Sequence, residues 1–233
     1  MKVAIFDFDG TIYKYETYSL MLDMAKQDPR FQDTFKRFYY SIVPPYLGYK
    51  IRLYPEAKMK YDLTQKYLRL LHGMTPAEVE AYFKEIATKM EDDLNELVLE
   101  RMEQHHDNND LIMVVSGAFT PLLQAVLKEF PVDHIIGTDI PFARDQVDST
   151  IPIDHVQAER KTELILETLK NNVIDWKNSY AYGDTMADIP VLEMVGNPVV
   201  VCPEAKPLPT NRNGRRFVKY ISYFYNKYGN SSI

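Results

Sequence analysis

The sequence predicts an α/β fold in which a Rossmann-like parallel sheet forms the core and a block of helices is inserted after the first strand. From residue 110 onward, short apolar runs alternate with helical patterns, which is typical of parallel strands covered by helices on both faces. Between residues 13 and 109 the pattern is helical throughout. We therefore expect a core made of residues 1–12 and 110–233 and a helical cap made of residues 13–109.

Five apolar runs are short enough to be buried strands, and they occupy residues 3–6, 111–115, 134–137, 179–182 and 198–201. Helices are expected between the later runs, at residues 120–130, 157–170 and 186–195. Because ligands bind outside the carboxyl ends of strands in open α/β sheets, polar residues that directly follow a run are candidates for a site.

One helix of the inserted block has a clear start signal. Thr75 is a good N-cap, Pro76 suits the first helical position, and Glu78 completes a capping box. Apolar residues at helical spacing then predict a helix that continues from Val79 to Leu97.

Prolines divide the earlier part of the block. Pro29 and the pair Pro44-Pro45 are expected to break it into separate helices. A helical block inserted between the first two strands would cover the carboxyl edge of the sheet, where we expect it to act as a lid.

Composition narrows the class of protein. The 233 residues are 45% hydrophobic and 26% charged, as in ordinary globular domains, and the net charge of −6 argues against a general nucleic-acid binder. Cys202 is the single cysteine, which favours a reducing compartment. No uncharged apolar run approaches the roughly 18 residues of a membrane helix, and Asp7 and Asp9 interrupt any secretory leader. We expect a soluble cytoplasmic protein with no integral membrane segment.

Two carboxylates follow the first apolar run. Asp7 and Asp9 lie two positions apart, and two neighbouring carboxylates need a cation or a proton between them. The alternative is that Asp9-Gly10 is only a turn after a strand.

Two further polar candidates are a strand end and a lysine on a helix. Ser116-Gly117 follows the second run and offers a hydroxyl and backbone N–H groups to an oxyanion, unless it is an ordinary turn. Lys161, near the start of a helix, is suited to stabilise a transferring anion, unless it is a solvated surface lysine.

A second pair of acids follows a later strand. Asp184 can reach the same cation as Asp7, and Asp188, one turn into a helix, can orient Asp184 or pair with Lys161. The alternative for Asp188 is compensation of the helix dipole.

Together, these motifs resemble those of the haloacid dehalogenase superfamily of phosphohydrolases. Its four motifs match Asp7 to Thr11, Ser116, Lys161, and Gly183 with Asp184 and Asp188. The inserted helices resemble its C1-type cap, and residues 182–203 resemble its phosphoserine-phosphatase-like branch, subfamily IB. The third motif departs from that branch, which often has glycines ahead of the lysine, so Arg160 is a competitor for Lys161.

The resemblance implies a Mg²⁺-dependent phosphomonoester hydrolase that forms an aspartyl-phosphate. Asp7 would be the nucleophile, Asp9 the general acid and base, and Ser116 and Lys161 would hold the transferring oxygens. The implied metal ligands are Asp7, the Asp9 backbone carbonyl, Asp184 and Asp188.

The resemblance also suggests how a small phosphorylated metabolite would bind. Thr11 and Gly117 would contact the phosphate, and Glu16, nine residues after Asp7, would read an amine. Arg52, with Lys50, would read a carboxylate or second anion. Glu16 is equally compatible with a surface acid at the first cap helix, whereas for Lys50 and Arg52 an ordinary solvated position is the favoured interpretation, because Lys and Arg are mostly exposed. The substrate implied is phosphoserine-like or an amino-alcohol phosphate, and the tyrosines near the first motif suggest an aromatic-lined pocket.

Other functions share these motifs. A phosphotransferase or mutase would pass the same aspartyl-phosphate to another acceptor, and a binding protein would keep the fold without the chemistry. The tail carries a basic stretch before an expected aromatic helix at residues 220–225, which leaves open a homodimer contact, an anion-binding surface or packing on its own sheet.

Overall fold

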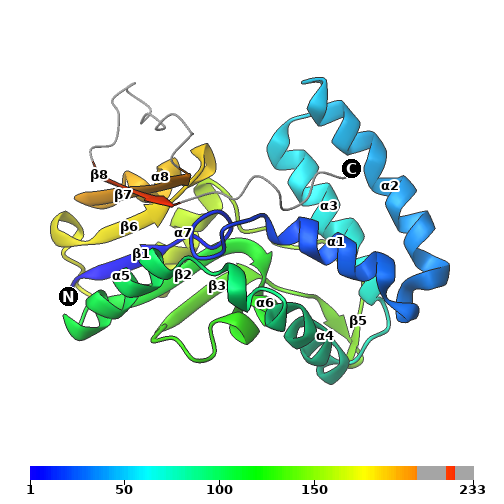
Figure 1. The fold of residues 1–233 in the computed structure, drawn as a ribbon, viewed down its shortest axis with the longest axis horizontal. Coiled ribbons are helices and arrows are strands. Elements are labelled where there is room, and N and C mark those ends of the chain that lie inside the picture. The colour runs from blue at the N-terminus through cyan, green and yellow to red at the C-terminus, as the bar shows by residue number, and fades with distance from the viewer. Residues whose placement is uncertain (204–218, 224–233) are drawn as a thin grey trace.

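A six-stranded parallel sheet lies at the centre of the protein. The computed structural model describes residues 1–203 and 219–223. The strand order is β3-β2-β1-β6-β7-β8, and every neighbouring pair is parallel (Figure 1). The strands are β1 Val3–Phe6, β2 Leu111–Phe119, β3 His134–Thr138, β6 Tyr180–Gly183, β7 Asn197–Pro203 and β8 Lys219–Tyr223. The predicted α/β class is thus confirmed.

Helices separate the strands in the predicted order. Those between β1 and β2 are α1 Thr17–Gln27, α2 Gln32–Lys50, α3 Glu56–Leu71, α4 Pro76–Thr88 and α5 Glu96–Asp107. The later helices are α6 Thr120–Val126, α7 Glu159–Thr168 and α8 Ile189–Leu192. Short 3-10 helices occupy Pro29–Phe31, Glu91–Asp93, Trp176–Asn178 and Met186–Asp188. Among the described helices, none combines the length and apolar character needed to cross a bilayer.

Successive side chains of β1 point to opposite faces of the sheet, and they are buried on both faces. Val3 and Ile5 pack in the cluster that contains apolar residues of α7 and α8, whereas Ala4 and Phe6 belong to the cluster on the opposite face. A central strand that is apolar on both sides fits a parallel sheet covered on both faces.

The inserted helices do not all lie in one place. Figure 1 shows α1, α2 and α3 beyond the carboxyl end of β1, whereas α5 lies along the sheet and contacts β2. The assignment of residues 13–109 to a separate cap stays a prediction.

Helix α2 passes through Pro44 and Pro45, so the predicted break there is wrong. A proline cannot donate to the carbonyl four residues earlier. The carbonyl oxygen of Ser41, four residues before Pro45, instead accepts a hydrogen bond from Lys66 Nζ of α3 at 2.9 Å. Packing of α3 on α2 thus supplies a hydrogen-bond donor for the Ser41 carbonyl, which Pro45 cannot bond within the helix. The predicted break at Pro29 is confirmed by the 3-10 helix between α1 and α2.

The capping box at Thr75 and Glu78 is present, but α4 ends at Thr88, so the predicted continuation to Leu97 is wrong. Leu94 is extended and bridges to Tyr13, and the Asn95 N–H donates to the Ile12 carbonyl at 2.8 Å. Residues 94 and 95 therefore pair with the segment that follows β1 and do not continue the helix, although the apolar residues there have helical spacing.

Two further segments differ from the prediction. The hairpin of β4 (Phe142–Ala143) and β5 (Gln146–Val147) was not expected. Residues 219–223 form strand β8, which pairs in parallel with β7 and extends the sheet. The aromatic helix expected at residues 220–225 is therefore wrong for residues 220–223. The basic residues Arg212, Arg215 and Arg216, with residues 224 and 225, lie outside the described residues.

Candidate active site

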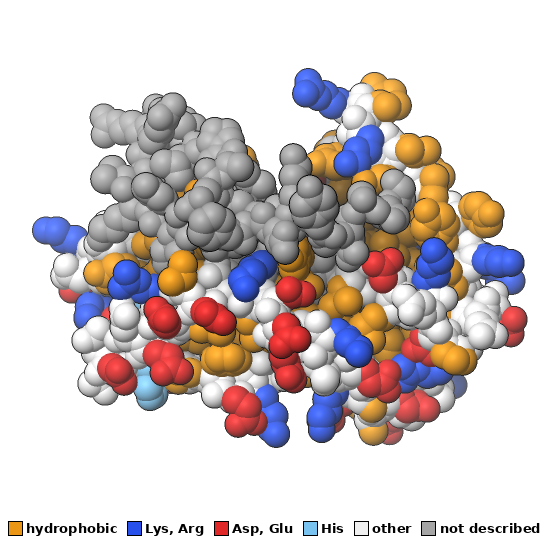
Figure 2. All heavy atoms as spheres, viewed as in Figure 1, with side chains coloured by type: hydrophobic (Ala, Val, Ile, Leu, Met, Phe, Trp, Pro, Cys, Tyr) orange, Lys and Arg blue, Asp and Glu red, His pale blue; other side chains and the backbone are white. Residues whose placement is uncertain are grey.

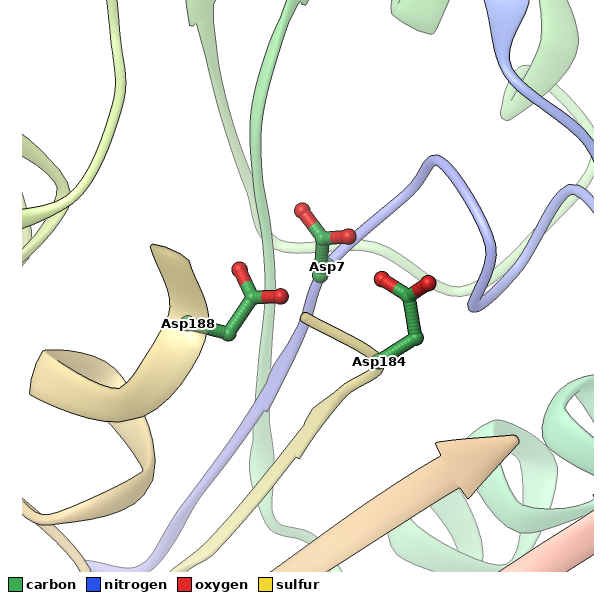
Figure 3. A group of neighbouring side chains, drawn as sticks. All are labelled: Asp7, Asp184 and Asp188. Atoms are coloured by element: carbon green, nitrogen blue, oxygen red, sulfur yellow. The ribbon is translucent and has the colours of Figure 1, made fainter. Parts of the chain in front are cut away.

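Three aspartates converge at the carboxyl edge of the sheet. Asp7 follows β1, Asp184 follows the neighbouring strand β6, and Asp188 ends the 3-10 helix before α8. One carboxylate oxygen from each lies within 4.8 Å of the others. Figure 3 shows the three carboxylates turned toward a common space. Strand β2 lies on one side of β1 and β6 lies on the other, so the strand order reverses at β1. The cluster lies at this point of reversal, where open α/β sheets bind ligands.

Lys161 of α7 contacts two members of this cluster. Its Nζ donates to Asp7 Oδ1 at 2.5 Å and to Asp188 Oδ1 at 2.7 Å, and the side chain is buried. Burial alone would lower the pKa of Lys161, but the carboxylates of Asp188 and Asp7 raise it above its ordinary value. Arg160, the competing residue, instead pairs with Asp154 and Glu163 on the outer surface.

The environment of Asp7 makes its negative charge costly. Burial is the main reason that the pKa of Asp7 rises to about 7, with Asp188 raising it further and Lys161 opposing. Apolar side chains including Ile5 and Val115 line the small pocket beneath this carboxylate. An added cation would therefore stabilise the ionised form of Asp7.

Asp188 is held on both oxygens. Its Oδ1 accepts from Lys161, and its Oδ2 accepts from the Thr185 N–H at 3.1 Å and the Thr185 hydroxyl at 2.9 Å. Burial would raise the pKa of Asp188, but Lys161 and these hydrogen bonds lower it below its ordinary value. Thr185 was not singled out from the sequence, although the spacing Thr-x-x-Asp is that of a capping box.

Asp9 is hydrogen-bonded to the start of α1. Its Oδ1 accepts hydrogen bonds from the Thr17 N–H at 3.0 Å and from the Thr17 hydroxyl. Burial and then the nearby charge of Glu16 raise the pKa of Asp9 to about 7, while Thr17 opposes this rise. Thr17 was missed because no local motif marks a threonine eight residues beyond its partner.

The Asp7–Thr11 loop approaches Asp184 closely. Gly10 has a left-handed φ of +76°, and a Cβ at this position would overlap the Asp184 carboxylate. Oxygen donors of this kind suit a hard divalent cation such as Mg²⁺. With both Asp188 oxygens held, Asp7 and Asp184 are the better-placed carboxylate ligands, and the expected role of Asp188 as a ligand stays a prediction.

Strand β2 continues to Phe119, so Ser116 and Gly117 lie inside it, at the register shift that follows Val115, and do not follow its end as predicted. Ser116 is buried, and its Oγ accepts from the Ala118 N–H at 3.2 Å. A Cβ on Gly117 would lie 3.1 Å from His155 Nε2, so the glycine permits this imidazole to pack directly on the backbone. Burial, followed by the charges of Lys60 and Lys161, lowers the pKa of His155 to about 4, so the imidazole is neutral.

The remaining candidates are Thr11, Glu16 and Arg52, and they differ in burial. Thr11 is fully buried, and its Oγ1 has no hydrogen-bond partner within the described part of the chain. Glu16 is exposed at the N-cap of α1, close enough to influence Asp9. Arg52 is exposed just after α2, and no ion pair links it to the acidic cluster among the described residues. The structure therefore does not bring Arg52 to the other predicted residues.

Comparison with known families gives one match over most of the chain. A family model described as haloacid dehalogenase-like hydrolase matches residues 4–193. Among curated proteins, an "Inhibition of morphological differentiation protein" from Streptomyces azureus is 25% identical over 103 residues. That match covers 44% of this chain and only 37% of the relative, so the chain corresponds to less than half of that protein.

Solved structures share the fold at low sequence identity. A Bordetella pertussis protein of unknown function has a TM-score of 0.70 at 20% identity, covering 86% of this chain and 89% of its own. A substrate-bound phosphoserine phosphatase has a TM-score of 0.60 at 18% identity, covering 88% and 87%. These similarities establish the fold of the protein.

Proposed function

Because the chain belongs to the haloacid dehalogenase-like hydrolase family, we propose that it is a Mg²⁺-dependent phosphomonoester hydrolase that acts through an aspartyl-phosphate. The observation that carries the proposal is the buried contact of Lys161 with Asp7 and Asp188, next to Asp184. A cluster of acids with one fixed cation is suited to bind a second cation together with a phosphate dianion.

Asp7, Asp184 and the backbone carbonyl of Asp9 would hold Mg²⁺. When bound, the ion supplies positive charge that offsets the repulsion between a phosphate dianion and a carboxylate nucleophile. The close approach of Gly10 to Asp184 supports a compact oxygen cage at this position.

The chain's own residues then divide the work of two half-reactions. An Asp7 oxygen attacks phosphorus while the bond to the leaving oxygen breaks, and the Asp9 carboxyl gives that oxygen its proton. Asp9 next takes a proton from the water that attacks the aspartyl-phosphate, which releases phosphate and regenerates Asp7. A pKa of about 7 for Asp9 suits both roles near neutral pH.

Other groups would orient the phosphate during transfer. Lys161 donates to one Asp7 oxygen and leaves the other available for attack. The Ser116 hydroxyl and Gly117 N–H lie in the part of the neighbouring strand β2 that follows its pairing with β1, where they would donate to phosphoryl oxygens. Thr11, whose hydroxyl is buried and unpaired within the described residues, would help hold the loop around them.

We place the substrate among small phosphorylated metabolites, with a phosphoserine-like or amino-alcohol phosphate as the favoured class. Glu16 lies close enough to the proposed general acid Asp9 to raise its pKa, and its charge would favour a cationic amine on the leaving group. One protein that shares the fold is a phosphoserine phosphatase. We further propose the cytoplasm as the compartment, since Cys202 is the single cysteine of the sequence and leaves no second cysteine for an intrachain disulfide.

A substrate panel tests this proposal. Phosphate release would be measured for phosphoserine, phosphoethanolamine, phosphocholine and a sugar phosphate, with Mg²⁺ or with EDTA. We expect turnover only with Mg²⁺, and we expect Glu16→Gln to lower kcat/KM about tenfold for amine-bearing substrates while sparing the sugar phosphate. The exposed Glu80→Gln is the matched control. Equal loss on every substrate would contradict the amine-reading role of Glu16.

A further inference from the structure

The end of the α2 and α3 hairpin exposes large aliphatic side chains. We name residues 47–58, which include the turn between the two helices, the hairpin tip. Leu47, Ile51 and Leu53 are 55%, 65% and 79% exposed there, and Tyr40, further back on α2, is 73% exposed. Figure 1 shows this end of the hairpin projecting away from the sheet, and Figure 2 shows hydrophobic side chains beside basic ones on the same projection. Such a grouping on a convex surface is typical of an interaction site.

The hairpin tip is basic although the protein is acidic. Residues 47–58 contain three basic side chains, Lys50, Arg52 and Lys58, and a single acid, Glu56, which gives a local charge of +2 in a chain of net charge −6. Charge of one sign gathered at one end of a molecule selects a partner of the opposite sign.

The backbone of the hairpin tip is fixed in a form that presents its apolar residues to solvent. The N–H groups of Leu53 and Tyr54 both donate to the Gly48 carbonyl, at 2.9 and 3.1 Å. Arg52 adopts a left-handed φ of 60° that reverses the chain. A Cβ on Gly48 would lie only 3.1 Å from Tyr54 Cβ, so the two sides of the turn are in close contact. The exposure of Ile51 and Leu53 is therefore built into the turn.

Tyrosine rings and lysine side chains alternate around these aliphatic residues. Lys50 Nζ lies 5.2 Å from the Tyr46 ring centre, and Lys58 Nζ lies 5.2 Å from that of Tyr54. Tyrosine prefers the boundary between water and lipid, and lysine can extend its charge from an apolar contact into the headgroup region.

We propose that the hairpin tip is a peripheral membrane-binding site that takes the surface of a bilayer rich in anionic lipids. The aliphatic side chains would enter the region between headgroups and acyl chains, and the surrounding basic residues would contact the anionic headgroups. A nucleic acid would match the positive charge but would leave Leu47, Ile51 and Leu53 without an apolar environment. The two properties together, charge and protruding aliphatic side chains, favour a bilayer.

Vesicle co-sedimentation of the full chain tests the proposal, with vesicles of phosphatidylcholine alone or with roughly 30 mol% phosphatidylglycerol. We expect the protein to sediment with the anionic vesicles, and we expect high salt to reduce that binding. The double variant Ile51→Ser/Leu53→Ser should reduce it about tenfold. The matched control is Leu97→Ser/Val173→Ser, which removes two exposed apolar side chains at other places and should bind as the wild type does.

Three outcomes would overturn the proposal. They are an absence of binding to anionic vesicles, equal binding by the hairpin-tip variant and the wild type, or equal loss in the control. Circular dichroism and thermal unfolding of each variant would show that the changed side chains, all exposed, leave the fold intact. Binding is read without substrate, so its result is independent of whether the protein hydrolyses a phosphate ester.

Discussion

Lys161 Nζ lies 2.5 Å from Asp7 Oδ1, although the two residues are separated by 154 positions in the sequence. The contact joins the carboxyl end of β1 to the first turn of α7, and the ammonium group continues to Asp188 at 2.7 Å. A buried cation that contacts two carboxylates fixes the orientation of the proposed nucleophile before substrate arrives. Such preorganisation is the form of electrostatic stabilisation that lowers reaction barriers most.

Replacing Lys161 tests whether this contact serves catalysis. We expect Lys161→Met to lower kcat about 100-fold or more, because Asp7 loses its orienting donor and the phosphate loses a fixed positive charge. Arg160→Ala is the control, since Arg160 is bound to Asp154 and Glu163 at the surface and should change kcat less than about twofold. The reverse pattern, with Arg160 essential and Lys161 dispensable, would assign the third motif to Arg160.

Thr17 is expected to act as a positioning residue for Asp9. Thr17→Val keeps the backbone N–H donor but removes the hydroxyl donor, so the pKa of Asp9 should rise further above its already raised value. The pH–rate profile should show its alkaline limb displaced to higher pH, with kcat lowered about tenfold. Thr88→Val, which removes an exposed hydroxyl at the end of α4, is the control. A fall in stability with an unchanged pH profile would mean that Thr17 is only structural.

Stability should depend on pH through Asp9. The pKa of this carboxyl rises from the ordinary value of 3.8 to about 7 in the folded protein, mainly through burial. The folded state then binds more protons than the unfolded state, so the contribution of Asp9 to stability falls as pH rises from about 4 to about 7.

Asp9→Asn should remove this loss, since an amide oxygen can still accept from Thr17. The free energy of unfolding would be measured with urea in the presence of EDTA. The difference between the variant and the wild type should shift in favour of the variant by on the order of 2 kcal/mol from pH 5 to pH 8. Asp107→Asn at the exposed end of α5 provides the comparison. A stability difference that does not change between the two pH values would contradict the raised pKa of Asp9.

The strands and the four motifs were predictable because their signals are local. An apolar run that ends in Asp7 or Asp184 fixes both the strand and the edge at which the acid lies. The parallel order of strands then brings these residues together without any knowledge of side-chain packing.

Other features depend on contacts between distant parts of the chain and could not be read locally. Pro45 is tolerated within α2 because Lys66 of α3 bonds the Ser41 carbonyl. Helix α4 ends early because Leu94 pairs with Tyr13. In the candidate site, Thr17 could be identified as the partner of Asp9 only once the start of α1 was known. The position of Arg52 likewise depends on how the hairpin of α2 and α3 packs. Tertiary pairing decided each case against the local pattern.

The identity of the residue that receives the phosphoryl group tests the central claim most directly. The protein would be mixed with Mg²⁺ and its best substrate, quenched in acid during turnover, and digested for peptide mass mapping. We predict one acid-stable, base-labile phosphoryl group on Asp7, absent in Asp7→Asn, whose phosphate release should fall on the order of 1,000-fold or more. A phosphoryl group on a different residue, or full turnover by Asp7→Asn, would contradict the account.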